Sequence, residues 1–178
     1  MLFWILNTTT KMTKKLHEEL ENFIRMYKSR NIEFPFMHCV SVSLELHKRF
    51  DFLCVFGAYC GKLDNEFRER FSKVKPEAGK YFNSIGHYMS YDPKRGVFID
   101  LTAMQFDKTL PDILIMDKDD PKIAMNWSTK NQNSLFIPYD MHKFKHSKGE
   151  LKEIAVDDSL KPDYMRDCML ERIMNNVR

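Results

Sequence analysis

The chain has 178 residues, a formal net charge of +3 and 30% charged residues, and its length fits one domain spanning residues 1–178. Hydrophobic residues make up 43%, and only six Gly and seven Pro are present, so the chain can bury a core and is not of low complexity. Acidic and basic residues are mixed along the sequence, which argues against a nucleic-acid-binding protein. No apolar run is long enough to span a membrane, so we expect no membrane partner.

Four cysteines are present, Cys39, Cys54, Cys60 and Cys168, and none has the spacing of a zinc site. We therefore expect reduced thiols in a cytoplasmic protein, with no metal and no cofactor. The apolar segment at residues 2–6 lacks the flanks of a signal peptide. It is expected to be a buried segment or a docked terminal strand. Alternatively, translation starts at Met12 and leaves this segment as an extension.

Helical spacing of apolar residues predicts three helices. The first runs from Thr13 to about residue 29, and the second from Cys39 to about residue 50. Pro35 disfavours helix in the residue before it, so residues 34–38 are expected to lead into the second helix as an extended segment. Cys39 would then stand in the first turn of that helix. The third helix is predicted at residues 161–176, with a proline in its first turn.

The middle of the chain reads mainly as strands. Residues 52–59 form a nearly continuous apolar run that is typical of a buried strand. A short helix and a loop are expected within residues 63–80, a strand at 112–117, irregular chain at 118–134 and an edge strand at 134–139, followed by a loop rich in Lys and His. Segregated helices and strands predict an α+β fold, with N-terminal helices packed on a mainly antiparallel sheet.

A β-hairpin is predicted around the turn at residues 92–96, whose Asp, Pro and Gly are turn formers flanked by β-branched and aromatic arms. His87 lies near the outer end of the first arm and Asp100 near the outer end of the second. Cross-strand neighbours in such a hairpin lie ~5 Å apart at the β-carbon. The hairpin therefore predicts an imidazole held by a carboxylate.

A nucleophile for this pair is expected at Cys39. A thiol reacts as the thiolate, and both a helix N-terminus and a neighbouring imidazolium lower its pKa. His87 would supply the imidazolium, and Asp100 would fix the tautomer and orientation of the ring. Amides of the first helical turn would face a developing oxyanion. The sequence thus predicts a Cys39–His87–Asp100 triad.

Other residues are candidates for a role in catalysis or metal binding. His38 could act as the base in place of His87. However, adjacent residues at a helix start point in different directions, so the His38 ring is not expected to face the Cys39 thiol. Asn31 and Gln105 are candidate oxyanion or substrate-binding groups. His142 and His146 are four residues apart, as metal ligands on a helix are, but their basic surroundings favour a solvated loop.

This pattern resembles the core of the papain-like and transglutaminase-like thiol enzymes over about residues 36–106. The resemblance lies in a Cys at a helix start, the strand end Gly57-Ala58-Tyr59-Cys60-Gly61, then His87-Tyr88-Met89, a hairpin and Asp100-Leu101-Thr102. In transglutaminase-like domains the corresponding segments read His-Ala-Trp and Asp-Pro-Thr. No Gln stands a few residues before Cys39, where papain-like enzymes place an oxyanion donor.

The expected function is that of a thiol-dependent amide hydrolase or acyltransferase acting on an intracellular protein or peptide. Peptidases, protein-glutamine deamidases and transglutaminases share the thioester mechanism, and the sequence does not separate them. The alternative is a non-catalytic protein-binding module, an inhibitor or effector, that keeps this fold and presents exposed aromatic residues such as Trp127 and Tyr139. The oligomeric state is left open.

Overall fold

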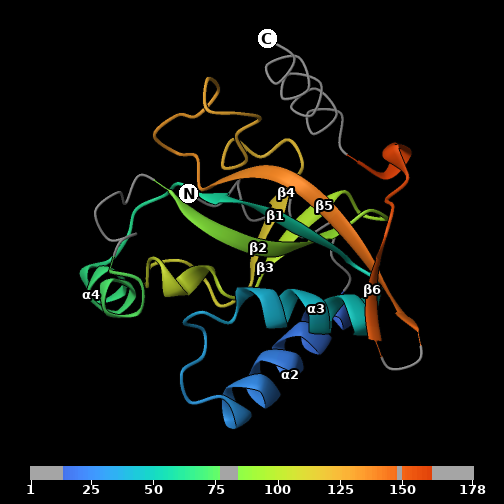
Figure 1. Cartoon of the computed structure of the whole chain (residues 1–178), viewed down its shortest axis with the longest axis horizontal. Coiled ribbons are helices and arrows are strands. Elements are labelled where there is room, and N and C mark those ends of the chain that lie inside the picture. Colours follow the sequence, from blue (N-terminus) through green and yellow to red (C-terminus); the bar gives the residue numbers. More distant parts are fainter. Residues whose placement is uncertain (1–13, 77–83, 148–149, 162–178) are drawn as a thin grey trace.

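The computed structural model describes residues 14–76, 84–147 and 150–161 (Figure 1). The apolar segment at residues 2–6, the possible start at Met12, Cys168 and all of the predicted C-terminal helix except Lys161 lie outside the described residues. Within the described part of the chain, no helix is long and apolar enough to cross a membrane.

The described chain folds around one six-stranded sheet with the strand order β4-β3-β2-β1-β5-β6. All the strand pairs are antiparallel, so the prediction of an α+β fold with a mainly antiparallel sheet is confirmed. The strands are β1 (Leu53–Tyr59), β2 (Ile85–Asp92), β3 (Val97–Asp100), β4 (Leu114–Asp117), β5 (Phe136–Ser147) and β6 (Glu150–Ile154).

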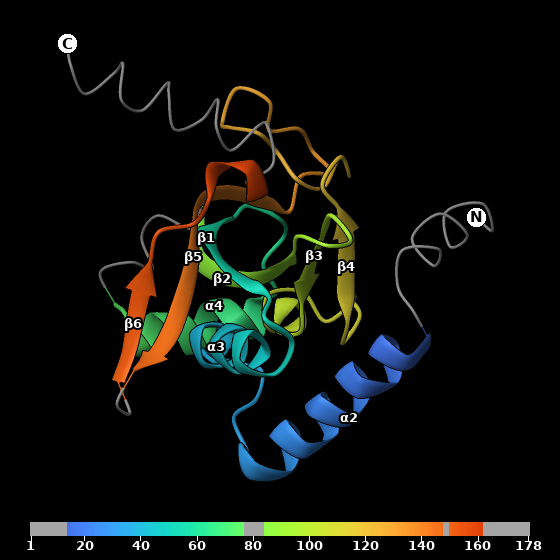
Figure 2. The same ribbon diagram turned by 90° about the vertical axis from the view of Figure 1, so that its right-hand side faces the viewer.

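Three α-helices are described: α2 (Lys14–Arg30), α3 (Cys39–Phe50) and α4 (Asn65–Val74). Two short 3-10 helices, η2 (Ala103–Gln105) and η3 (Asp158–Leu160), complete the elements. Figure 2 shows α3 between α2 and the sheet. The predicted apolar face of α2 is buried there, with α3 and β3, in one core cluster. Each fully buried aliphatic side chain of this kind contributes about 1.5–3 kcal/mol.

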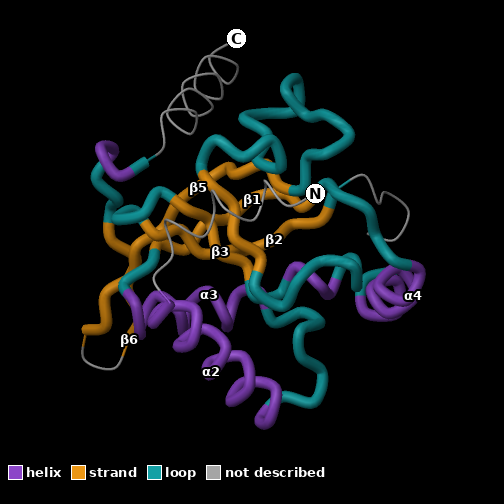
Figure 3. Tube along the Cα trace, turned by 180° about the vertical axis from the view of Figure 1, so that it is seen from behind, coloured by secondary structure: helices purple, strands orange, loops and turns teal. Residues whose placement is uncertain are grey.

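The opposite face of the sheet is covered by the long loop between β4 and β5 (Figure 3). Its Ile123 packs in a second core cluster with Met89, Tyr91 and Phe98 from the hairpin. The loop is irregular, as predicted. Its apolar residues cover this face of the sheet and exclude water from the core.

The structure overturns the prediction for residues 134–147. β5 continues to Ser147 and lies between β1 and β6, so it is neither an edge strand nor followed by a basic loop. Pro138 is tolerated because the register shifts between Phe56 and Gly57, next to the Gly57–Pro138 pair. His142 is part of this strand, and its Nδ1 lies 2.5 Å from Glu153 of β6, a strand that the sequence did not predict.

Helix α3 is fixed to the sheet by buried polar side chains. Ser43 donates to the Met89 carbonyl at 3.1 Å. Near the other end of the helix, the buried His47 ring lies between two backbone carbonyls, with Nδ1 2.7 Å from the Phe52 oxygen and Nε2 2.6 Å from the Phe144 oxygen. These bonds tie the helix to β2, to the chain entering β1 and to β5. The first residue of α3 is thereby held at a defined place beside the sheet.

Candidate active site

Cys39 is the first residue of α3, as predicted, and is half-buried. Residues 34–38, predicted to be extended, instead form turns as far as Met37, whose positive φ of 63° bends the chain just before the helix. The Met37 N–H donates to Gln105 Oε1 of η2 at 3.0 Å, and Phe36 packs on Phe67 of α4 with ring centroids 5.8 Å apart. The segment leading into α3 is therefore fastened to η2 and α4.

The structure brings His87 and Asp100 together. His87 Nε2 donates to Asp100 Oδ2 at 2.6 Å, and the two side chains are 0% and 2% exposed. The backbone N–H and Oγ1 of Thr102 donate to Asp100 Oδ1 at 2.8 and 2.9 Å. The last β2–β3 pair is Ser90–Ile99, so His87 and Asp100 sit on the diagonal rather than directly opposite each other, still within reach of long side chains.

The Cys39 thiol meets the other side of the His87 ring. His87 Nδ1 is buried and has no hydrogen-bond partner of ordinary geometry among the described residues. The thiol is nevertheless close enough for the two groups to shift each other's pKa, and the Tyr88 backbone also helps to lower the pKa of Cys39. β3 pairs only with residues 90–92 of β2, which leaves this stretch of the β2 edge open to the thiol.

These contacts shift both pKa values in the direction that nucleophilic chemistry needs. Burial raises the pKa of Cys39, but the hydrogen bond and the charge of His87 outweigh it and lower the pKa below its ordinary value. Burial lowers the pKa of His87, but Asp100 and then Cys39 outweigh it and raise the pKa to about 10. By contrast, burial raises the pKa of Cys54 and of Cys60. Of these three thiols, Cys39 is the one poised to be a thiolate beside an imidazolium.

Three aromatic rings enclose the His87 imidazole, and sequence reasoning missed them. Phe106, Phe136 and Tyr59 have ring centroids 4.9, 6.0 and 6.5 Å from that of His87, and all three stand nearly perpendicular to it. Perpendicular packing of this kind favours a positively charged ring next to aromatic faces. The enclosure fixes the orientation of the imidazole and keeps bulk water from it.

Gly57 makes room for this enclosure. A Cβ on Gly57 would lie 2.3 Å from the Ile137 carbonyl oxygen and 2.4 Å from Cζ of Phe136. Gly57 also pairs with His87 across β1 and β2. The glycine therefore lets the Phe136 ring cross β1 and reach the imidazole. The only sequence signal for it was a glycine inside an apolar strand, which is typical of close approach by another group.

Two of the predicted accessory residues are engaged by Tyr27 of α2. Asn31 Nδ2 donates to the Tyr27 carbonyl at 3.0 Å. His38 precedes α3, and its ring packs edge-on against Tyr27 at 5.6 Å and near Phe34 at 6.1 Å. Tyr27 Oη lies 3.4 Å from His38 Nδ1. The structure thus uses both side chains to brace the α2–α3 connection.

Gln105 is placed differently from these two residues. Its Oε1 accepts the Met37 N–H, while its Nε2 is buried and has no hydrogen-bond partner among the described residues. A buried amide without a partner costs about 1–3 kcal/mol. A ligand that accepts a hydrogen bond from Nε2, beside the loop that carries Cys39, would recover that cost. Gln105 is therefore the accessory candidate that retains an unused donor.

In the part of the chain that the structure describes, no group of His, Cys, Asp and Glu side chains could hold a metal ion. No family model matches this chain, and neither does any curated protein or solved structure.

Proposed function

We propose that the protein is a thiol-dependent amide hydrolase or acyltransferase with a papain-like or transglutaminase-like arrangement of Cys39, His87 and Asp100. One observation carries the proposal. A fully buried imidazole is hydrogen-bonded through Nε2 to a buried carboxylate, keeps Nδ1 without a hydrogen-bond partner among the described residues, and interacts electrostatically with a thiol at a helix start. A structural histidine has no need of a thiol with a lowered pKa, whereas a catalytic base does.

The reaction follows from the two charged groups. The Cys39 thiolate attacks an amide carbonyl carbon and forms a tetrahedral oxyanion. The His87 imidazolium gives its Nδ1 proton to the leaving amine, which departs as the C–N bond breaks and a thioester forms. His87 then takes a proton from water, or from an acceptor amine, as that nucleophile attacks the thioester and releases the thiolate.

The oxyanion would be stabilised by backbone N–H groups of the first α3 turn and by Gln105 Nε2. The helix start supplies N–H groups without intrahelical partners, and Gln105 supplies a buried donor without a partner. Such donors act at the point where charge develops and are usually the largest single contribution to catalysis. The substrate would be an amide of a protein or peptide, either in the main chain or on a glutamine side chain.

The test is the selective alkylation of Cys39. We expect iodoacetamide at pH 7 to label Cys39 faster than Cys54, Cys60 and Cys168, as measured by peptide mass spectrometry. A His87→Ala variant should lose this selectivity, while far-UV circular dichroism shows that the fold is kept. Equal labelling of all four thiols, or undiminished labelling in His87→Ala, would contradict the proposal.

A non-catalytic binding module remains the alternative, because the β4–β5 loop exposes large apolar side chains. Trp127 is 48% exposed and Met125 is 40% exposed, and Lys130 Nζ lies 5.2 Å from the centre of the Trp127 ring. Exposed aromatics next to cations are common at protein interfaces. Selective reactivity of Cys39 would favour the enzyme, and its absence would favour the binding module.

A further inference from the structure

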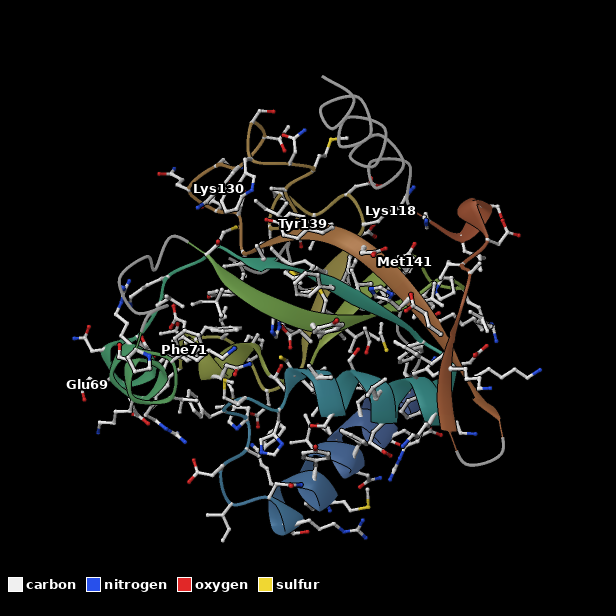
Figure 4. All side chains as sticks on the ribbon, in the orientation of Figure 1. Glu69, Phe71, Lys118, Lys130, Tyr139 and Met141 are labelled. Atoms are coloured by element: carbon white, nitrogen blue, oxygen red, sulfur yellow. The ribbon has the colours of Figure 1, made fainter. Side chains whose placement is uncertain are left out.

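Beside Cys39, three aromatic side chains form a continuous surface that we call the aromatic shelf: Phe56, Tyr88 and Tyr139. Phe56 and Tyr88 are paired across β1 and β2, with ring centroids 5.0 Å apart. Phe56 also contacts Tyr139 of β5, with centroids 6.2 Å apart; Figure 4 labels Tyr139 on that strand. Each of the three side chains is only half-buried, so apolar ring surface remains open to a ligand.

The shelf adjoins the nucleophile. The Tyr88 backbone lies close enough to the Cys39 thiol to lower its pKa. Because side chains alternate along a strand, the Tyr88 ring lies on the opposite face of β2 from the His87 ring. Helix α3 covers the next residue on that face, because Ser43 lies 3.4 Å from Ser90 Oγ. Cys39 is the first residue of α3, so the cover by α3 ends at the thiol.

The chain around Cys39 adds further exposed apolar surface. Met37 is 45% exposed and Val40 is 46% exposed, two residues before and one residue after the thiol. Gly86, two residues before Tyr88 in β2, is exposed, and a Cβ on it would lie 3.5 Å from the Phe56 ring. Exposed apolar residues gathered at a reactive group mark a ligand-binding surface.

We propose that the aromatic shelf binds a bulky apolar or aromatic side chain of the substrate, on the residue next to the amide that Cys39 attacks. This inference rests on the proposed function, and it narrows the substrate to a peptide segment with a large apolar residue beside the reacting group. Ring burial against three aromatic side chains supplies the binding energy. The substrate backbone supplies none of this selectivity.

The negative charges near the shelf disfavour a substrate that has Asp or Glu at the residue bound there. The pKa of Tyr88 is raised by burial, by the Cys54 and Cys39 thiols, and by the carboxylates of Asp140 and Glu153. At neutral pH, a substrate carboxylate on the shelf would face the carboxylates of Asp140 and Glu153 and the Cys39 thiolate. It would also lose its hydration without gaining a partner.

The test uses peptidyl acyloxymethyl ketones, which alkylate cysteine nucleophiles, with Phe, Leu, Ala, Lys or Asp next to the reactive ketone. We expect Cys39 to react about tenfold or more faster with the Phe and Leu probes than with the Ala probe, and slowest with the Asp probe. Tyr139→Ala should reduce the preference for Phe over Ala by several-fold, whereas Tyr139→Phe should keep it. Trp127→Ala, which removes an exposed aromatic ring from the β4–β5 loop, is the matched control and should change nothing.

Iodoacetamide, which is too small to occupy the shelf, separates this inference from the proposed function. We expect it to alkylate Cys39 at the same rate in wild type and in Tyr139→Ala. Selective iodoacetamide labelling without any preference among the probes would overturn the shelf while leaving the reactive thiol in place. A preference for the Asp or Lys probe, or an undiminished Phe preference in Tyr139→Ala, would overturn it equally. If iodoacetamide does not label Cys39 selectively in the wild-type protein, the proposed function itself is refuted.

Discussion

Replacement of Asp100 by Asn gives a sharp test of how the thiolate is maintained. The two Thr102 donors hold the Oδ1 position at 2.8 and 2.9 Å, so the amide oxygen of Asn is expected to take that place. The amide nitrogen then faces His87 Nε2 at the position of Oδ2, 2.6 Å away. The amide nitrogen can only donate, so His87 Nε2 has to accept and cannot carry a proton. The ring is then held neutral, with its proton on Nδ1.

The size of the effect follows from the His87 pKa. The pKa of His87 rises from the ordinary 6.5 to about 10, and Asp100 is the largest cause of the rise. Without that carboxylate the imidazolium is no longer favoured, and Cys39 loses the positive charge that lowers its pKa. A thiol with an ordinary pKa of ~8.5 is ~3% ionised at pH 7. We therefore expect Asp100→Asn to slow alkylation of Cys39 about 30-fold at pH 7.

The assay is timed iodoacetamide alkylation of Cys39 between pH 5 and 10, read by peptide mass spectrometry. The variant should approach the wild-type rate above about pH 9, where a thiol ionises without help. Asp107→Asn is the matched control, because Asp107 Oδ1 accepts the same two bonds, at 2.9 and 2.7 Å, from Thr109. It should react like wild type. Wild-type rates for Asp100→Asn at pH 7 would refute the role of the carboxylate.

Three further predictions concern the same site. The lowered pKa of Cys39 should make its alkylation fast at pH values well below 8.5, and turnover of an amide substrate should fall as the pH approaches 10 and His87 loses its proton; a maximum only above pH 9 would contradict this. Gln105→Leu should lower kcat about 100-fold with little change in the alkylation rate, and an equal fall in both would argue against an oxyanion role. Gly57→Ala should lower the free energy of unfolding in urea by about 2–3 kcal/mol, because the new methyl group overlaps the Phe136 ring, and an unchanged midpoint would refute the close approach.

Local chemistry in the sequence was enough to predict the elements that carry the triad. The Asp-Pro-Lys-Arg-Gly turn located the hairpin of His87 and Asp100, because turn residues between β-branched arms fix a hairpin independently of the rest of the chain. The helical spacing after residue 38 located Cys39 at the start of α3, although the extended lead-in predicted from Pro35 is a series of turns. The cross-strand contact then followed from strand geometry, although its diagonal register did not.

The surroundings of the triad could not be predicted in the same way. Phe106 and Phe136 reach His87 from η2 and β5, and sequence periodicity reports which face of an element is buried but not which residue of another element meets it. Residues 140–147 contain two Lys and two His but only two apolar residues, Met141 and Phe144, a composition common to loops and to strands in a polar hairpin, so the sequence alone does not predict a strand there. The pairing with β6 is a tertiary effect that no local pattern in the sequence reports.

The close approach at Gly57 also links the fates of two positions that are 79 residues apart in the chain. Any side chain at position 57 displaces the Phe136 ring, and a smaller residue at position 136 leaves a cavity beside the His87 imidazole. The two positions should therefore change together in related sequences, glycine with a large ring and alanine with a smaller residue. In the laboratory, Phe136→Leu should recover part of the stability lost in Gly57→Ala, so that the pair behaves as one coupled unit in a double-mutant cycle.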